Sequence, residues 1–174
     1  MDDYAGLKAR REAVTAALIR RHEDYYDLNL QPLGCLAARG DFYMHSEKYV
    51  LVKKARLWEA DCNEFVYIFS TEELTEAGLR ECIAYGYRNG MEKIHPGPAH
   101  MCSYITVLVI CESCTKQAEK ALRRCRIRRN FKLSFHGWME LQAGVAVCED
   151  GRVTVNGSGK RKRKLLKSVM EECL

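Results

Sequence analysis

The run Tyr104–Cys111 constrains the fold more than any other part of the sequence. It reads Tyr-Ile-Thr-Val-Leu-Val-Ile-Cys and lacks the apolar–polar alternation of a strand with one solvent-facing side. The run is rich in β-branched residues and much shorter than the ~20 residues that a membrane-spanning helix needs. These features predict a strand buried on both faces, at the centre of a sheet with helices above and below.

Amphipathic segments on either side of this strand predict helices. The segment 71–90 should begin with a capping box of Ser70 and Glu73 and should stop near Asn89–Gly90. Apolar residues at helical spacing predict three more helices, at about 3–25, 115–126 and 159–172.

Two other regions have the composition of strands. Residues 33–69 suit an antiparallel meander with strands near 33–44, 48–58 and 64–69 and a turn at 59–63. Alternate apolar residues run from Phe131 to Val147. An unbroken strand of that length would extend about 55 Å, against a domain diameter near 40 Å, so it should break at His136–Gly137.

The predicted order α-βββ-α-β-α-ββ(β)-α indicates an α/β protein whose mixed sheet has helices on both faces. A length of 174 residues fits one domain, with an N-terminal helix in 1–30, a sheet core in 33–155 and a basic helix in 157–174. The acidic start lacks the apolar segment of a signal peptide, which favours a soluble cytoplasmic protein with no membrane contact. The oligomeric state is not indicated.

The nine cysteines favour free thiols in a reducing compartment, because their number is odd and their spacing irregular. Cys82, Cys102 and Cys148 have apolar neighbours and are expected to be small core residues. Cys111 and Cys114 stand where the central strand meets the next helix, whose N-terminus would stabilise a thiolate. This is the arrangement of a thioredoxin-like redox pair, but every proline lies upstream of it, so the pair is a weak catalytic candidate.

Metal and cofactor sites are not expected. Cys111, Cys114, Cys125 and His136 have tempting spacings, but Cys114 and Cys125 would lie about 16 Å apart along a helix, too far for Zn–S bonds of about 2.3 Å. The order α-βββ-α-β is also that of the restriction-endonuclease-like core. The metal site of that core needs a lysine two residues after an acidic residue, and Glu64-Phe65-Val66 lacks this lysine. A restriction-endonuclease-like relative with this sequence would therefore be inactive.

Positive charge is concentrated in the last third of the chain. Residues 1–110 contain 13 Lys/Arg and 16 Asp/Glu, a net −3, whereas residues 111–174 contain 15 and 7, a net +8. Such clusters bind phosphate backbones, and they also occur as solvated helix surfaces. The hypothesis we rank first is therefore a binding module for nucleic acid or another polyanion, provided that the last helix packs near the helix at 115–126. The candidate residues are Arg123, Arg124, Arg126, Arg128, Arg129, Lys132, Lys160, Arg161, Lys162 and Arg163.

A second candidate surface follows from counting along the alternating segment. His136, Trp138, Glu140 and Gln142 should share the face opposite to Met139 and Leu141. If no helix covers that face, His136, Trp138 and Glu140 would line a small-ligand surface.

Four short segments resemble an uncharacterised bacterial domain family of unknown function. They are Ser46–Tyr49, Glu64–Phe69, His100–Thr106 and Phe135–Met139. The resemblance spans about residues 42–160 and implies a compact intracellular domain, without indicating an activity.

Overall fold

The computed structural model describes the backbone of residues 2–49 and 56–173 and the side chains of residues 5–44 and 61–173. Its elements follow in the expected order, α-βββ-α-β-α-βββ-α, so the mixed α/β fold is confirmed. The helices are α1 (Asp2–Glu23), α2 (Glu76–Lys93), α3 (Lys116–Arg124) and α4 (Lys160–Glu172). The strands are β1 (Asp27–Asn29), β2 (Leu36–Tyr49), β3 (Arg56–Leu74), β4 (His100–Cys114), β5 (Arg128–Asn130), β6 (Trp138–Val147) and β7 (Val153–Val155).

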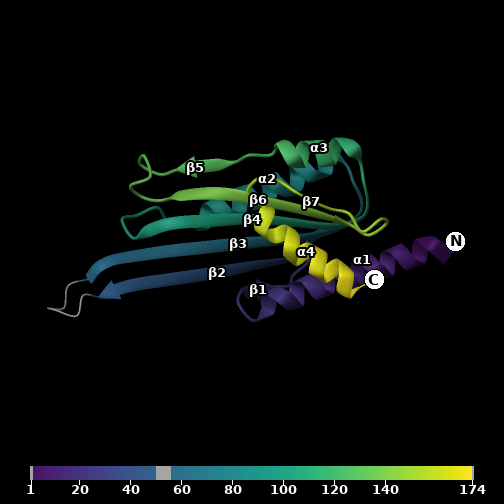
Figure 1. Cartoon of the computed structure of the whole chain (residues 1–174), viewed down its shortest axis with the longest axis horizontal. Helices are drawn as coiled ribbons and strands as arrows, with labels where there is room; N and C mark the ends of the chain where they lie inside the picture. The colour runs from purple at the N-terminus through teal and green to yellow at the C-terminus, as the bar shows by residue number, and fades with distance from the viewer. Residues whose placement is uncertain (1, 50–55, 174) are drawn as a thin grey trace.

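All seven strands belong to one sheet, in the order β1-β2-β3-β4-β6-β5, with β7 also pairing with β6 (Figure 1). β3, β4 and β6 are parallel, and β1, β2, β5 and β7 are antiparallel to their neighbours. β4 is an interior strand, and residues 105–112 are all buried. The prediction that Tyr104–Cys111 forms the centre of the sheet is confirmed.

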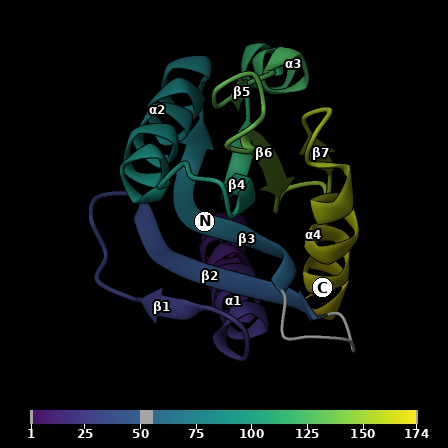
Figure 2. The same cartoon turned by 90° about the vertical axis from the view of Figure 1, so that its left-hand side faces the viewer.

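The helices cover the sheet in two pairs (Figure 2). α2 and α3 pack on one face, over a core that includes Phe65, Val107 and Leu141. α1 and α4 pack on the other, over a core that includes Ile68 and Leu108. Successive strand residues point to opposite faces, so odd-numbered residues of β4 and β6 mostly face α2 and α3 and even-numbered ones face α1 and α4.

The strands predicted over 33–69 are partly wrong. β3 runs without a break through 59–63, where we predicted a turn, and these residues pair with 43–47 of β2. Pairing with a long partner strand outweighs the local turn preference of Asp61 and Asn63, because each ladder position satisfies backbone groups that a turn would expose. The predicted strand 48–58 falls largely on residues outside the described part of the chain.

The predicted capping box at Ser70 is also wrong. β3 continues to Leu74, which pairs with Cys114 of β4, and the helix begins at Glu76. Thr75 is the N-cap of α2, and its hydroxyl accepts a hydrogen bond from the Gly78 amide at 3.1 Å. Gly90 does not end the helix but lets it approach the sheet, because a Cβ there would lie 2.7 Å from the Ile105 side chain.

The break expected at His136–Gly137 is confirmed. β6 starts at Trp138, and Gly137 has φ +77°, a conformation that favours glycine. Residues 131–137 form a loop between β5 and β6 in which Lys132, Leu133 and Ser134 all have positive φ. No helix of the described chain is both long and apolar enough to cross a membrane.

Candidate nucleic-acid interface

The two basic clusters lie on helices that cover opposite faces of the sheet. α3, which ends in Arg123 and Arg124, packs with α2, whereas α4 packs with α1. The condition that the last helix packs beside the helix at 115–126 is therefore not met. The segment after α3 nevertheless extends along the sheet edge as β5, and it brings some of the first cluster to the α4 side.

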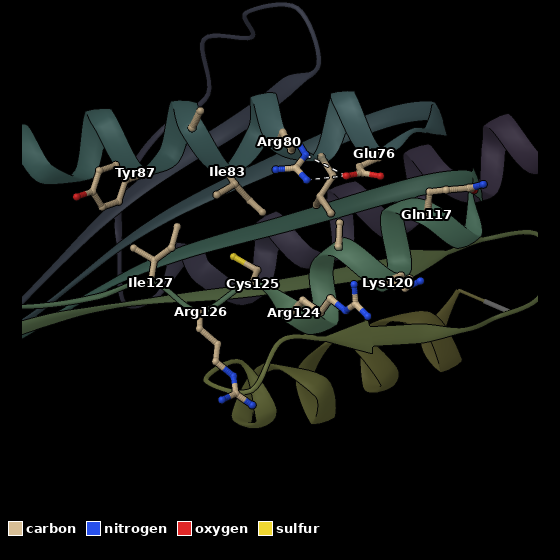
Figure 3. A pocket seen from close by; sticks show the side chains of 13 residues that line it. Glu76, Arg80, Ile83, Tyr87, Gln117, Lys120, Arg124, Cys125, Arg126 and Ile127 are labelled. Atoms are coloured by element: carbon tan, nitrogen blue, oxygen red, sulfur yellow. Dashed lines mark hydrogen bonds and ion pairs between the residues drawn. The ribbon is translucent and has the colours of Figure 1, made fainter.

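Strand register decides which of these cations face α4. Arg128 pairs with Glu140 and therefore shares its face, whereas Arg129 pairs with the buried Met139 and faces α2 and α3. Arg126, two residues before Arg128, points away from the α2–α3 side (Figure 3). The start of α4 is tied to the same place, because Ser158 donates a hydrogen bond to Glu140 Oε1 at 2.9 Å.

Aromatic side chains meet these cations on that face. The Arg128 guanidinium carbon lies 4.6 Å from the centre of the Trp138 ring, a cation–π contact. Trp138 packs edge-to-face against Tyr104, with ring centres 5.4 Å apart. Tyr104, Trp138 and Glu140 are all partly exposed, so this set, with Arg128, forms an open surface that we call the Trp138 platform.

The other predicted residues of this surface are placed differently. Gln142 lies on the expected face but is only 5% exposed, and its Oε1 has no hydrogen-bond partner among the described residues. His136 precedes the strand, and its carbonyl oxygen is 2.8 Å from His100 Nδ1. Of the predicted ligand-surface residues His136, Trp138 and Glu140, only Trp138 and Glu140 belong to the Trp138 platform.

The β5–β6 loop beside the platform exposes large apolar side chains. Leu133 is 90% exposed and Phe135 is 81% exposed. Three consecutive left-handed residues other than glycine are unfavourable by about 1–2 kcal/mol each. Such strain is typical of functional loops, and here it accompanies an apolar tip next to a basic strand.

α4 carries four cations in its first turn and no acidic residue. Lys160, Arg161 and Arg163 are exposed, but Lys162 turns inward, and its Nζ lies 2.5 Å from Glu64 Oε1. Gly159 provides no side-chain cap, so the positive end of the helix dipole adds to the cationic charge. Lys162 therefore has a structural partner, and the other three cations face solvent.

Glu64 is held by donors from three elements. Besides Lys162, it accepts hydrogen bonds from Thr106 Oγ1 at 2.6 Å and from the Tyr26 hydroxyl at 2.9 Å. Burial alone would raise the pKa of Glu64, but the Lys162 charge and the three hydrogen bonds hold the pKa below its ordinary value. This cluster fastens α4 and the turn after α1 to the sheet, on the same face as the platform.

The cysteines differ in part from the prediction. Cys62 and Cys102 form a disulfide between β3 and β4, so the expectation that all thiols are free is wrong. Adjacent parallel strands bring these two residues into register, which their separation in sequence concealed. Cys102 is buried in the core, as expected. Cys82 and Cys148 are free and buried, as expected.

Cys111 and Cys114 interact electrostatically, which lowers the pKa of Cys114; the same interaction and burial raise the pKa of Cys111. The Cys111 thiol donates to the Ala146 carbonyl oxygen and the Cys114 thiol to the Thr115 carbonyl oxygen, each at 3.6 Å. Cys111 is buried, while Cys114 is partly exposed, next to the N-cap Thr115 of α3. Within the described residues, no cluster of three or more His, Cys, Asp or Glu could hold a metal ion.

Sequence reasoning missed Tyr104, Phe135 and Glu64 as site residues. Tyr104 was assigned to the buried centre, although its even position on β4 places it beside Trp138. Phe135 falls within the apolar alternation that starts at Phe131, but β6 begins only at Trp138. The partner of Glu64 comes from α4, and no local pattern indicates that pairing.

A protein-family model described as a domain of unknown function (DUF8052) matches residues 10–168. No curated protein and no solved structure gives a significant match to the chain. The geometry above is therefore the basis for assigning a function.

Proposed function

From the surface chemistry of this chain, which belongs to the DUF8052 family, we propose that it binds single-stranded nucleic acid at the Trp138 platform and the flanking basic residues. The observation that carries the proposal is the contact of Arg128 with Trp138, which joins a cation and an aromatic ring on an open sheet face. Proteins that bind single strands combine a positively charged track for the backbone with aromatic rings for the bases. The sequence alone predicted the cations but did not indicate that aromatic rings lie beside them.

The charge and the exposure of these side chains support a path for the nucleic-acid strand. Arg126 and Arg128 contribute charge at the sheet edge, and Lys160 and Arg161 contribute it at the start of α4. The exposed Phe135 ring on the adjacent loop offers a further stacking surface. A flexible single strand can follow this combination of a flat face and a protruding loop more easily than a rigid duplex.

A salt titration tests the proposal. Fluorescence anisotropy with single-stranded RNA, single-stranded DNA and duplex DNA should show tighter binding of the single strands, and affinity should fall steeply with salt. Replacing Arg126 and Arg128 together with Ala should lower the slope of log affinity against log salt by about 0.7 for each lost contact with a single strand. Arg88→Ala, an exposed cation on α2, is the matched control and should leave the slope unchanged.

A second variant separates stacking from charge. Trp138→Leu should reduce single-strand affinity by about 1–3 kcal/mol without changing the salt slope, because a stacked base contributes about that much. Absence of binding to all three nucleic acids at low ionic strength would refute the proposal. If Arg88→Ala lowers affinity as much as the Arg126/Arg128 variant does, binding depends on non-specific charge and not on the Trp138 platform.

A second candidate function is dithiol–disulfide exchange by Cys111 and Cys114. It rests on the position of the partly exposed Cys114 beside the N-cap of α3 and on the interaction with Cys111 that lowers the pKa of Cys114. The Cys114 thiolate would attack a substrate disulfide, and Cys111 would then close an intramolecular disulfide and release the substrate as two thiols. Cys111→Ala should raise the pKa of Cys114 and slow its alkylation near neutral pH, and an unchanged pH profile of alkylation would remove this candidate.

A further inference from the structure

A groove between α2 and α3, on the face of the sheet opposite to the Trp138 platform, has the features of a ligand site (Figure 3). Its volume is about 700 Å³, within the range of sites for small molecules. The side chains of Leu79, Ile83, Tyr87, Ala121, Cys125 and Ile127 form its apolar surface.

The unequal lengths of the two helices explain the groove. α2 and α3 start side by side, because the Thr115 amide donates to the Leu74 carbonyl at 3.0 Å just before both helices. With a rise of 1.5 Å per residue, α2 is about 27 Å long and α3 about 14 Å. Beyond Arg124 the chain becomes extended, so the second half of α2 has no helix beside it, and Ile83 and Tyr87 stay partly exposed.

The cations that point into the groove gather toward the helix starts, because Arg126, the lining cation near Ile127, points away from α2 (Figure 3). Arg80, Lys120 and Arg124 lie at the end near the helix starts, whereas Tyr87 and Ile127 lie at the other (Figure 3). Glu76 is the one acidic lining residue, and it is paired with Arg80 at 2.6 Å. Among the described residues, neither Lys120 nor Arg124 has an acidic partner.

From this polarity we propose that the groove binds an amphiphilic carboxylate, a fatty acid of medium chain length. Its head would meet Lys120 and Arg124, and its chain would lie along Ile83, Tyr87 and Ile127. The seven residue steps from Arg80 to Tyr87 span about 10 Å of helix. An extended chain advances about 1.2 Å per bond, so about nine bonds cover this distance. Decanoate has that length.

Charge near the helix starts and an apolar stretch beyond it fit a carboxylate with one apolar chain. An acidic amphipathic helix, about 10–12 Å in diameter, has the same polarity, and its binding is an outcome of the test.

Isothermal titration calorimetry of the full chain with decanoate tests the proposal, and decanol serves as the uncharged comparison. Lys120→Glu with Arg124→Glu should weaken decanoate binding at least tenfold and leave decanol binding unchanged. Arg88→Glu, on α2 but outside the groove lining, should change neither. Ala121→Trp, which fills the apolar floor, should weaken both ligands.

Several outcomes overturn the proposal. They are no decanoate binding below its self-association concentration, equal decanoate affinity in wild type and the Lys120/Arg124 variant, and binding of an acidic amphipathic peptide in place of decanoate. If the charge-reversal variant loses its circular dichroism spectrum, Lys120→Gln with Arg124→Gln replaces it under the same criteria. Nucleic-acid binding at the Trp138 platform should be unaffected by Ala121→Trp, so failure of either proposal can be recognised independently.

Discussion

Lys162→Met should destabilise the fold strongly, because it leaves the Glu64 carboxylate without its cationic partner. The two side chains are 15% and 16% exposed, so water replaces little of the lost interaction. Breaking a buried ion pair by removing one partner costs about 3–5 kcal/mol. Thr106 and Tyr26 still donate to Glu64, which places the expected loss in the free energy of unfolding at the lower end, about 3 kcal/mol.

The pH dependence of the stability loss in Lys162→Met tests the role of the ion pair more sharply than the size of the loss at one pH. In wild type the pKa of Glu64 is lowered, so its ionisation stabilises the fold above the ordinary carboxyl pKa of about 4.3, and this stabilisation is lost as pH falls through the folded value. In Lys162→Met, burial dominates and should raise the pKa of Glu64. Protonation would then relieve the buried charge, and the stability gap between variant and wild type should narrow as the pH falls from 7 to 4.

Urea unfolding followed by circular dichroism at several pH values measures this gap. Arg161→Met, an exposed neighbour on α4, is the matched control and should lie within about 0.5 kcal/mol of wild type. Adding Glu64→Gln to Lys162→Met removes both charges and should restore most of the loss. A Lys162→Met variant as stable as Arg161→Met, or a gap that stays constant with pH, would refute the assigned role of the ion pair.

Two further predictions concern local backbone geometry. Gly137→Ala should destabilise by more than about 2 kcal/mol, because φ is +77° and a Cβ would collide with the carbonyl oxygen of His100. Gly97→Ala, where a Cβ meets nothing within 4 Å, should change thermal unfolding little, and equal effects would contradict this account. Thr75→Ala should cost about 1 kcal/mol in urea unfolding by removing the hydrogen bond to the Gly78 amide, and Thr75→Ser should retain most of it.

The features predicted correctly are those for which a local pattern is sufficient. Tyr104–Cys111 is apolar on both sides, and only an interior strand covered by helices buries both faces. The break at Gly137 was located by the glycine, which has φ +77°. Length alone does not require a break there, because β3 of the same sheet runs for 19 residues. Helices α3 and α4 follow their apolar spacing closely.

The failures arose where pairing with a distant strand outweighed a local preference. Ser70 and Glu73 form an acceptable capping box, yet the sheet continues to Leu74 because β4 supplies a parallel partner as far as Cys114. Parallel partners are separated by a whole crossover helix, so their register cannot be read from either segment alone. The Cys62–Cys102 disulfide was missed for the same reason.

The parity of residues along β5 and β6 explains how one short segment serves both proposed sites. On β6, Met139 and Leu141 face α2 and α3, while Trp138 and Glu140 face α4. Because β5 pairs with β6, the residues of β5 and those just before it alternate between the same two faces. Ile127 therefore faces the groove, whereas Arg128 lies over Trp138 on the other side. In the sequence, this segment is only a run of basic residues with one isoleucine. The strand register is what directs Ile127 to the proposed acyl groove and Arg128 to the proposed nucleic-acid surface. A substitution at Ile127 should therefore affect decanoate alone, and a substitution at Arg128 should affect nucleic acid alone.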